Sequence, residues 1–172
     1  MDLNRSLILA HQLLVSGKID EAEKMLNEIL NLDPKNLHAL NNLGNLYIEK
    51  KNFSKSINFF EKCLEIDKNF YQALANKGTC HQKLNQYSIA LKCFEKTIKL
   101  NPNFIDIYYN IGNCFLKLDR YEEAILNYNK IIEKKPNFIN AIFNKALCYE
   151  KLENYNSAIE IYKKIIEIKK DF

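Results

Sequence analysis

The chain has 172 residues, 47% of them hydrophobic and 27% charged, and its formal net charge is +4. This length and this proportion of hydrophobic and charged residues are typical of one globular domain. The net positive charge is smaller than that of a typical nucleic-acid-binding protein. No apolar run approaches the roughly 18 residues that a membrane span needs. We therefore predict no nucleic-acid partner and no membrane partner.

The five cysteines are an odd number without CxxC spacing, which argues against a disulfide framework and against a metal site. Because free thiols persist in reducing compartments, we expect the protein in the cytoplasm or the nucleus. The N-terminus carries Asp2 and His11 and lacks a small-residue cleavage site. We interpret it as a first helix rather than a signal peptide.

The chain divides into five copies of a 34-residue pattern, which together account for residues 3–172. In chain order the copies are 3–36, 37–70, 71–104, 105–138 and 139–172. Position 8 of the copies is always small: Ala10, Gly44, Gly78, Gly112 and Ala146. Position 20 is also small: Ala22, Ser56, Ala90, Ala124 and Ala158. Position 24 is large and apolar: Leu26, Phe60, Phe94, Tyr128 and Tyr162.

Each copy is expected to form two helices, helix A over about the first fourteen positions and helix B over roughly positions 17 to 31. Small residues at positions 8 and 20 let the two helices approach closely, and the large residue at position 24 fills the space between neighbouring pairs. Proline at position 32 of three copies ends helix B. Four polar residues near the start of helix B are expected to cap it: Asp20, Ser54, Ser88 and Asn156.

The first and last copies differ from the others. The first has Ser6 at position 4 and Ile8 at position 6, as a terminal repeat often does. In the last helix B we expect Tyr162, Ile165 and Ile166 to form an uncovered apolar face. Three explanations of that face stay open: a fragment of a longer protein, self-association at the uncapped end, or a swapped end.

A 34-residue pattern with small residues at 8 and 20, an aromatic residue at 24 and proline at 32 resembles the tetratricopeptide repeat (TPR) family over essentially the whole chain. The resemblance implies an all-α fold, a right-handed superhelical solenoid of five TPR helix-turn-helix repeats that forms a single domain over residues 1–172. It further implies that the A helices line a concave groove and the B helices form the convex back. Members of the family act as adaptors in protein–protein interaction.

Catalytic motifs are absent from the sequence. It contains no Gly-rich phosphate loop, no HExxH motif and no nucleophile elbow. The three histidines fall on separate predicted A helices without the spacing of metal ligands. We therefore expect that the protein is not an enzyme and that it has no catalytic residues, no cofactor and no metal.

Asparagine recurs on the predicted groove side of the A helices. It occupies position 6 in four copies, and position 9 carries Asn, Thr and Asn in the three middle copies. An amide donates and accepts hydrogen bonds together, which suits the backbone of an extended peptide. Position 5 adds two aromatic residues, which either anchor ligand side chains or pack against the neighbouring repeat. The predicted peptide-binding residues are Asn42, Asn45, Asn76, Thr79, Asn110, Asn113, Asn144, Tyr109 and Phe143.

This ladder resembles the asparagine ladder in the TPR superhelix of the O-linked N-acetylglucosamine transferases. The alternative is that the amides are only solvated and locally hydrogen-bonded. The two-carboxylate clamp of co-chaperones is a second known ligand mode, and it needs lysine or arginine at three of its five positions. From the second copy onward these positions read Asn41, Asn45, Asn76, Asp106 and Asn110. Because the cations are missing, we do not expect Hsp70 or Hsp90 C-terminal tails to bind.

Together these features predict a non-catalytic scaffold that binds a peptide segment or a partner protein in the groove of the A helices. The identity of that partner does not follow from the sequence. One alternative is the targeting or substrate-recruiting TPR region of a larger enzyme. Another is a self-associating assembly module that oligomerises through Leu7, Leu14 and Val15 or through the last helix B.

Overall fold

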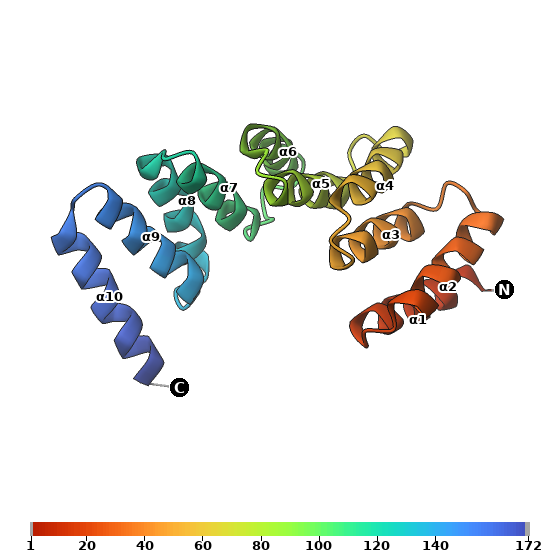
Figure 1. Ribbon diagram of the computed structural model, residues 1–172, viewed down its shortest axis with the longest axis horizontal. Coiled ribbons are helices and arrows are strands. Elements are labelled where there is room, and N and C mark those ends of the chain that lie inside the picture. Colours follow the sequence, from red (N-terminus) through yellow and green to blue (C-terminus); the bar gives the residue numbers. More distant parts are fainter. Residues whose placement is uncertain (1, 171–172) are drawn as a thin grey trace. The chain divides into compact units, whose positions relative to one another are not determined.

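The structure is a computed structural model that describes residues 2–170, and the side chains of residues 2–168. The described residues contain ten α-helices and no strand (Figure 1). The helices are α1 Leu3–Val15, α2 Ile19–Leu32, α3 Leu37–Glu49, α4 Phe53–Ile66, α5 Tyr71–Lys83, α6 Tyr87–Leu100, α7 Ile107–Lys117, α8 Tyr121–Lys134, α9 Ile139–Lys151 and α10 Tyr155–Lys170. Odd-numbered helices are the predicted A helices and even-numbered helices the predicted B helices, so the all-α class and the five helix pairs are confirmed.

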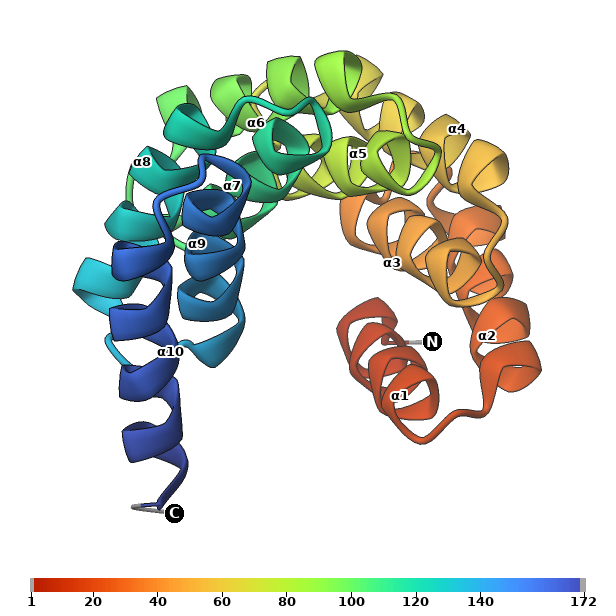
Figure 2. The same cartoon turned by 60° about the vertical axis from the view of Figure 1, so that its left-hand side comes forward.

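The chain contains two compact units, Met1–Gln86 and Tyr87–Phe172, whose boundary falls between the two helices of the third copy. Within the first unit α1 contacts α3 and α3 contacts α5, and within the second α7 contacts α9. In the described part of each unit, no even-numbered helix contacts another even-numbered helix. The odd-numbered helices therefore form the inner layer of each unit, and the even-numbered helices lie outside it (Figure 2).

Inside a helix pair, the residue at position 8 lies directly against the ring at position 24. A Cβ atom on Gly44 would overlap the Phe60 ring, and one on Gly112 would lie 2.5 Å from the Tyr128 ring. Both rings are fully buried. At position 20 the hydroxyl of Ser56 donates to the Gly44 carbonyl over 2.6 Å, so this buried polar side chain is satisfied. The small residues thus serve the close approach that the sequence predicts.

Every A helix ends in the same turn, in which position 15 has a positive φ angle. The residues at this position are Gly17, Lys51, Asn85, Asp119 and Glu153, with φ between 56° and 77°. In the second copy, for example, the Lys51 N–H donates to the Ile48 carbonyl and the Asn52 N–H donates to the Tyr47 carbonyl, both over 2.8 Å. These two bonds form a Schellman motif, which satisfies the last carbonyls of the helix.

The predicted caps of the B helices are wrong by two positions. Asn52 accepts from the Lys55 N–H over 3.1 Å, and Asn154 accepts from the Ser157 N–H over 3.2 Å. The expected caps Ser54 and Asn156 lie inside the first turn of their helices instead. The Schellman turn fixes this offset, because it occupies the residues directly before the cap.

The last helix, α10, has a partly uncovered outer face. Ile165 is only 8% exposed, so the expectation that it is uncovered is wrong. Ile166 is 55% exposed, and Tyr155 and Ile159 are exposed as well. The exposed residues therefore lie about one quarter of a turn away from the face that packs against α9.

Replacing Gly44 by Ala is expected to destabilise the first unit by about 1–3 kcal/mol, because the new methyl group overpacks the Phe60 ring. The free energy of urea-induced unfolding measures the effect. The first copy pairs Ala10 with the smaller Leu26 at the same two positions. Phe60→Leu should therefore lower the free energy of unfolding less in the Gly44→Ala protein than in the wild type. If the losses from the two substitutions simply add, the overpacking explanation is contradicted.

Replacing Lys51 by Gly is expected to stabilise the protein by about 0.5–1 kcal/mol, because glycine adopts the left-handed conformation without a Cβ clash. Thermal and urea unfolding measure the change. Asn85→Gly is the matched control, since asparagine already tolerates this conformation. An equal gain at both positions would show that the left-handed turn is not the cause.

Candidate peptide-binding face

In the first unit, asparagine side chains on neighbouring inner helices are hydrogen-bonded to one another. The Nδ2 group of Asn76 on α5 donates to Oδ1 of Asn45 on α3 over 2.9 Å and to Oδ1 of Asn41 over 3.3 Å. All three residues are half-buried. Position 6 of one copy is thus tied to position 9 of the copy before it.

The second unit repeats this bond and adds a tyrosine to it. Oδ1 of Asn113 on α7 accepts from Nδ2 of Asn144 on α9 and from the hydroxyl of Tyr128 on α8, both over 2.8 Å. Burial raises the pKa of Tyr128, so its phenol stays protonated and remains a donor. Two donors on one oxygen fix the orientation of the Asn113 amide. Its Nδ2 group is the remaining donor.

The ladder is interrupted between the first and second copies. Position 9 of the first copy is His11, and no hydrogen bond of the described structure joins it to Asn42 at position 6 of the next copy. Instead a hollow of about 580 Å³ lies between α1 and α3. Its lining residues are Asn4, Leu7, Ile8, His11, Gln12, His38 and Asn42.

A second hollow of about 280 Å³ adjoins the first and shares His11 and Asn42 with it. It is also lined by Leu14, Val15 and Asn45. Asn42 therefore lies where the two hollows meet, and its amide has no hydrogen-bond partner among the described residues. Apolar side chains from α1 and amides from α3 share this surface, so it offers apolar contact and hydrogen-bonding groups together.

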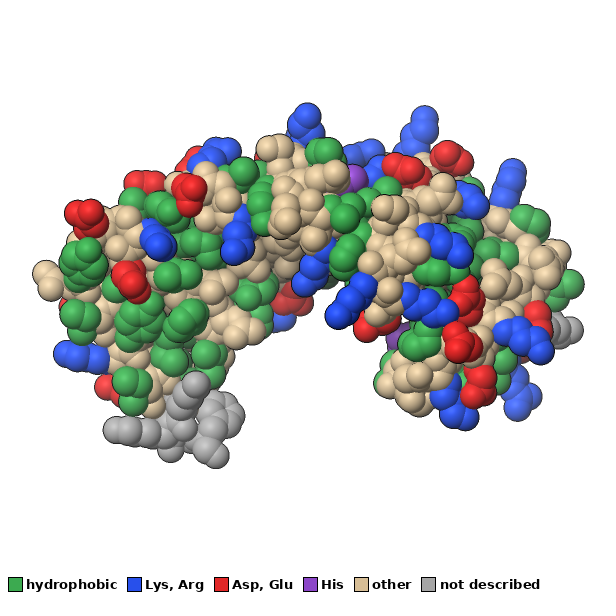
Figure 3. Space-filling model, viewed as in Figure 1, with side chains coloured by type: hydrophobic (Ala, Val, Ile, Leu, Met, Phe, Trp, Pro, Cys, Tyr) green, Lys and Arg blue, Asp and Glu red, His purple; other side chains and the backbone are tan. Residues whose placement is uncertain are grey.

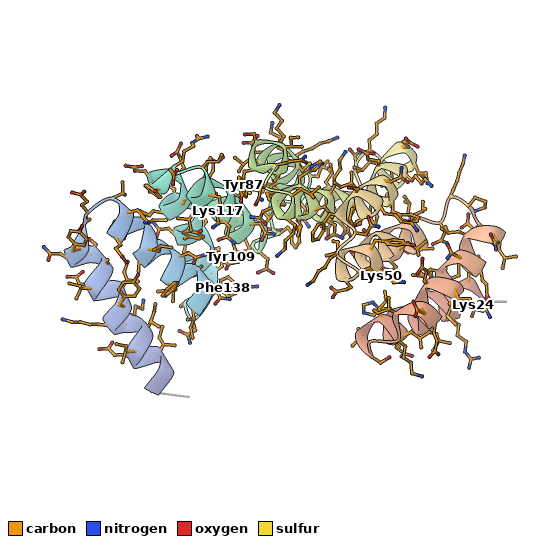
Figure 4. All side chains as sticks on the ribbon, viewed as in Figure 1. Lys24, Lys50, Tyr87, Tyr109, Lys117 and Phe138 are labelled. Carbon is orange, nitrogen blue, oxygen red and sulfur yellow. The ribbon has the colours of Figure 1, made fainter. Side chains whose placement is uncertain are left out.

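The other predicted site residues have different surroundings. Thr79 donates its hydroxyl to the Ala75 carbonyl of its own helix over 3.1 Å, and Asn110 is half-buried on α7. The Tyr109 ring packs edge-on against Phe138 at 5.1 Å between centroids (Figure 4). Phe143 is 48% exposed and lies 5.7 Å from the Tyr162 ring.

The first copy supplies residues that were not predicted as part of the site. His11 and Gln12 of the first copy line the hollows together with His38 of the second copy, while the sequence pattern pointed to amides, one threonine and two aromatic residues of the second and later copies. One signal was present in the sequence, because histidine replaces asparagine or threonine at position 9. That substitution removes the partner that position 6 has in the later copies.

A charged cluster outside the hollows joins the first copy to the second. Lys50 at the end of α3 lies 2.6 Å from Glu23 and 3.0 Å from Asp20 on α2 (Figure 4). The hydroxyl of Tyr47 also donates to Glu23, and Lys55 contacts the same hydroxyl. The bond from Lys50 and then the bond from Tyr47 lower the pKa of Glu23. This cluster stabilises the packing of α2 on α3, and with it the wall of the hollows.

Four of the five cysteines are buried, and the fifth, Cys93, is half-buried. Burial raises the pKa of Cys63 to about 12 and that of Cys148 to about 11, so both thiols are protonated at neutral pH. Within residues 2–170, no three His, Cys, Asp or Glu side chains are grouped so that they could hold a metal ion. Among the described helices, none is long and apolar enough to cross a membrane.

Comparisons with known proteins agree with the fold. Family models described as the tetratricopeptide repeat match residues 38–70, 71–104, 105–138 and 139–172. A structure of MamA from Desulfovibrio magneticus RS-1 is similar with a TM-score of 0.90 and 20% identity, and the match covers 99% of this chain and 97% of that one. A further MamA structure has a TM-score of 0.85 and 25% identity, over 94% and 95% of the two chains.

YrrB, described as a TPR protein with an unusual peptide-binding site, is similar with a TM-score of 0.79 and 25% identity. That match covers 96% of this chain and 86% of YrrB. No curated protein sequence matches the chain significantly.

Glu23→Gln is expected to lower the free energy of unfolding at pH 7 by no more than about 1 kcal/mol, because the carboxylate is partly exposed and screened. The folded state depresses the pKa of Glu23, so its contribution is present above the unfolded value of 4.5 and is lost as the pH falls below it. The difference in the free energy of unfolding between wild type and Glu23→Gln should therefore shrink as the pH falls from 5 to 3. A difference that stays constant over this range would contradict the ion pair.

Proposed function

The chain belongs to the tetratricopeptide repeat family, and from this premise we propose that it is a non-catalytic scaffold that binds a peptide segment or a partner protein on its A helices. The matching family models describe a structural repeat and not a catalytic domain. The similarity to YrrB over 96% of the chain supports a peptide as the ligand.

The unpaired amide of Asn42 carries the proposal. In the later steps of the ladder, Asn76 and Asn144 donate to the copy before them. Asn42 has no such bond, and it faces hollows on both sides. Because the amide of Asn42 is half-buried at the hollows and has no protein partner, both its donor and its acceptor are available to a ligand.

The ligand that fits this surface is an extended segment with an apolar side chain. The Asn42 amide would accept from a backbone N–H and donate to a backbone carbonyl of the segment. Leu7 and Ile8 would contact the apolar side chain, since Ile8 is 61% exposed at the hollow. Because the polar contacts go to the backbone, the preference for sequence would be loose.

We extend the same role to the other predicted residues of each unit. In the first unit these are Asn45, Asn76 and Thr79, and in the second they are Asn110, Asn113, Asn144, Tyr109 and Phe143. The free Nδ2 of Asn113 would donate to a ligand carbonyl. The exposed ring of Phe143 would contact a ligand side chain, whereas Tyr109 would act mainly by supporting α7 from the core.

Asn42→Ala is expected to weaken binding about threefold to tenfold, the value of one hydrogen bond. The probe is a 15-residue peptide selected from a random phage-displayed library, and fluorescence anisotropy gives its dissociation constant. Asn58→Ala is the matched control, since Asn58 is exposed on α4 of the outer layer. Unchanged affinity in Asn42→Ala, or an equal loss in Asn58→Ala, would overturn the proposal.

A further inference from the structure

The outer face of α10 repeats the surface on which α8 receives α9. Four residues of α8 follow one another at helical spacing along that surface: Tyr121, Ile125, Tyr128 and Ile132. The equivalent residues of α10 are of the same four types: Tyr155, Ile159, Tyr162 and Ile166. Identical side chains in an identical order predict the same kind of packing partner.

Burial separates the two surfaces. Ile125 is 8% exposed and Tyr128 is fully buried, and both belong to one cluster with Ala141 and Cys148 of α9. On α10, Ile159 is 50% exposed, and Tyr155 and Ile166 are more than half exposed. Hydrophobic side chains gather at the surface over α9 and α10 in the space-filling view (Figure 3). The face of α10 therefore has the residues of a helix-binding surface without the helix.

The internal interfaces show what such a helix presents. α9 places Ala141 and Cys148 against α8, and both are fully buried. α5 places Ala73 and Cys80 against Phe60 of α4 in the same way. In both cases two small residues lie seven positions apart, which allows close approach to the tyrosine or phenylalanine ring. A helix that covers α10 needs the same two small residues.

One of these two interfaces also contains an ion pair. In the first unit Lys77 lies four residues after Ala73, and its Nζ is 2.7 Å from Glu61 of α4. Glu61 directly follows the ring residue of α4, and the equivalent residue of α10 is the exposed Lys163. The sign of the charge is thus reversed on α10. A covering helix in the same register would place an acidic residue opposite Lys163.

The chain's own α1 does not meet these requirements. At the two positions where α5 and α9 have small residues, α1 has Arg5 and Gln12, and both are exposed. Their bulk and polarity would hold α1 away from the tyrosines of α10. Head-to-tail stacking of a second copy is therefore disfavoured.

We propose that the outer face of α10 is a second docking site, which binds an amphipathic helix of a partner protein. That helix carries a small residue, an acidic residue four positions later and a second small residue seven positions after the first. It packs on α10 as α9 packs on α8, and its acidic residue pairs with Lys163. This face adjoins the proposed peptide-binding residues at Phe143 of α9, whose ring lies 5.7 Å from the Tyr162 ring of α10.

Two stapled peptides with the sequence of α9 test the proposal. One keeps Lys145 and the other carries Lys145→Glu, which is the position opposite Lys163 in the proposed register. The Lys145→Glu peptide should bind the wild-type protein about twofold to fivefold more tightly, as expected for an exposed ion pair. Lys163→Glu in the protein should reverse this preference. Fluorescence anisotropy measures both affinities.

Ile159→Asp in the protein should weaken both peptides at least tenfold without unfolding, because Ile159 is half exposed. Leu126→Asp is the matched control on α8, where Leu126 is 61% exposed and lies outside the docking face. The proposal would be overturned if Ile159→Asp leaves the affinity for the peptides unchanged. It would also be overturned if Lys163→Glu does not reverse the preference between the two peptides. A dimer of the protein in sedimentation analysis would also overturn the proposal, if Ile159→Asp abolishes that dimer and neither peptide dissociates it. In that case a second copy of the chain would cover α10.

Discussion

The close contact between a small residue at position 8 and a large residue at position 24 is the constraint on which each helix pair depends. At Gly44 and Gly112 there is no room for even one methyl group beside the ring. Within each unit the inner helices of neighbouring copies also touch one another. The amides at positions 6 and 9 meet as a result, because their spacing is set by the distance between inner helices.

The asparagines therefore have two roles that compete for the same atoms. Asn45 with Asn76 and Asn113 with Asn144 bond to each other and stabilise the stacking of neighbouring copies. Only the groups left over from those bonds are available to a ligand. At Asn42 the whole amide is left over, which is why the hollows beside α1 are the best candidate for the binding face.

The sequence was sufficient for the helices but not for the details of the site. A strict 34-residue period places every helix within about two residues, because small and large residues alternate at fixed positions. The left-handed turn at Lys51 and Glu153 was not predicted, since neither residue favours that conformation by itself. The interruption at His11 was missed for a different reason. It depends on a bond that fails to form between residues in different copies, and a pattern of positions does not show which amides are paired.

The most direct test of the binding face is an NMR titration that follows side-chain amide signals as a selected peptide is added. If the account is correct, the side-chain amide of Asn42 shifts most and those of Asn45 and Gln12 shift with it, while that of Asn58 on the outer layer stays in place. Shifts confined to the outer helices, with the Asn42 signal unmoved at saturation, would contradict it.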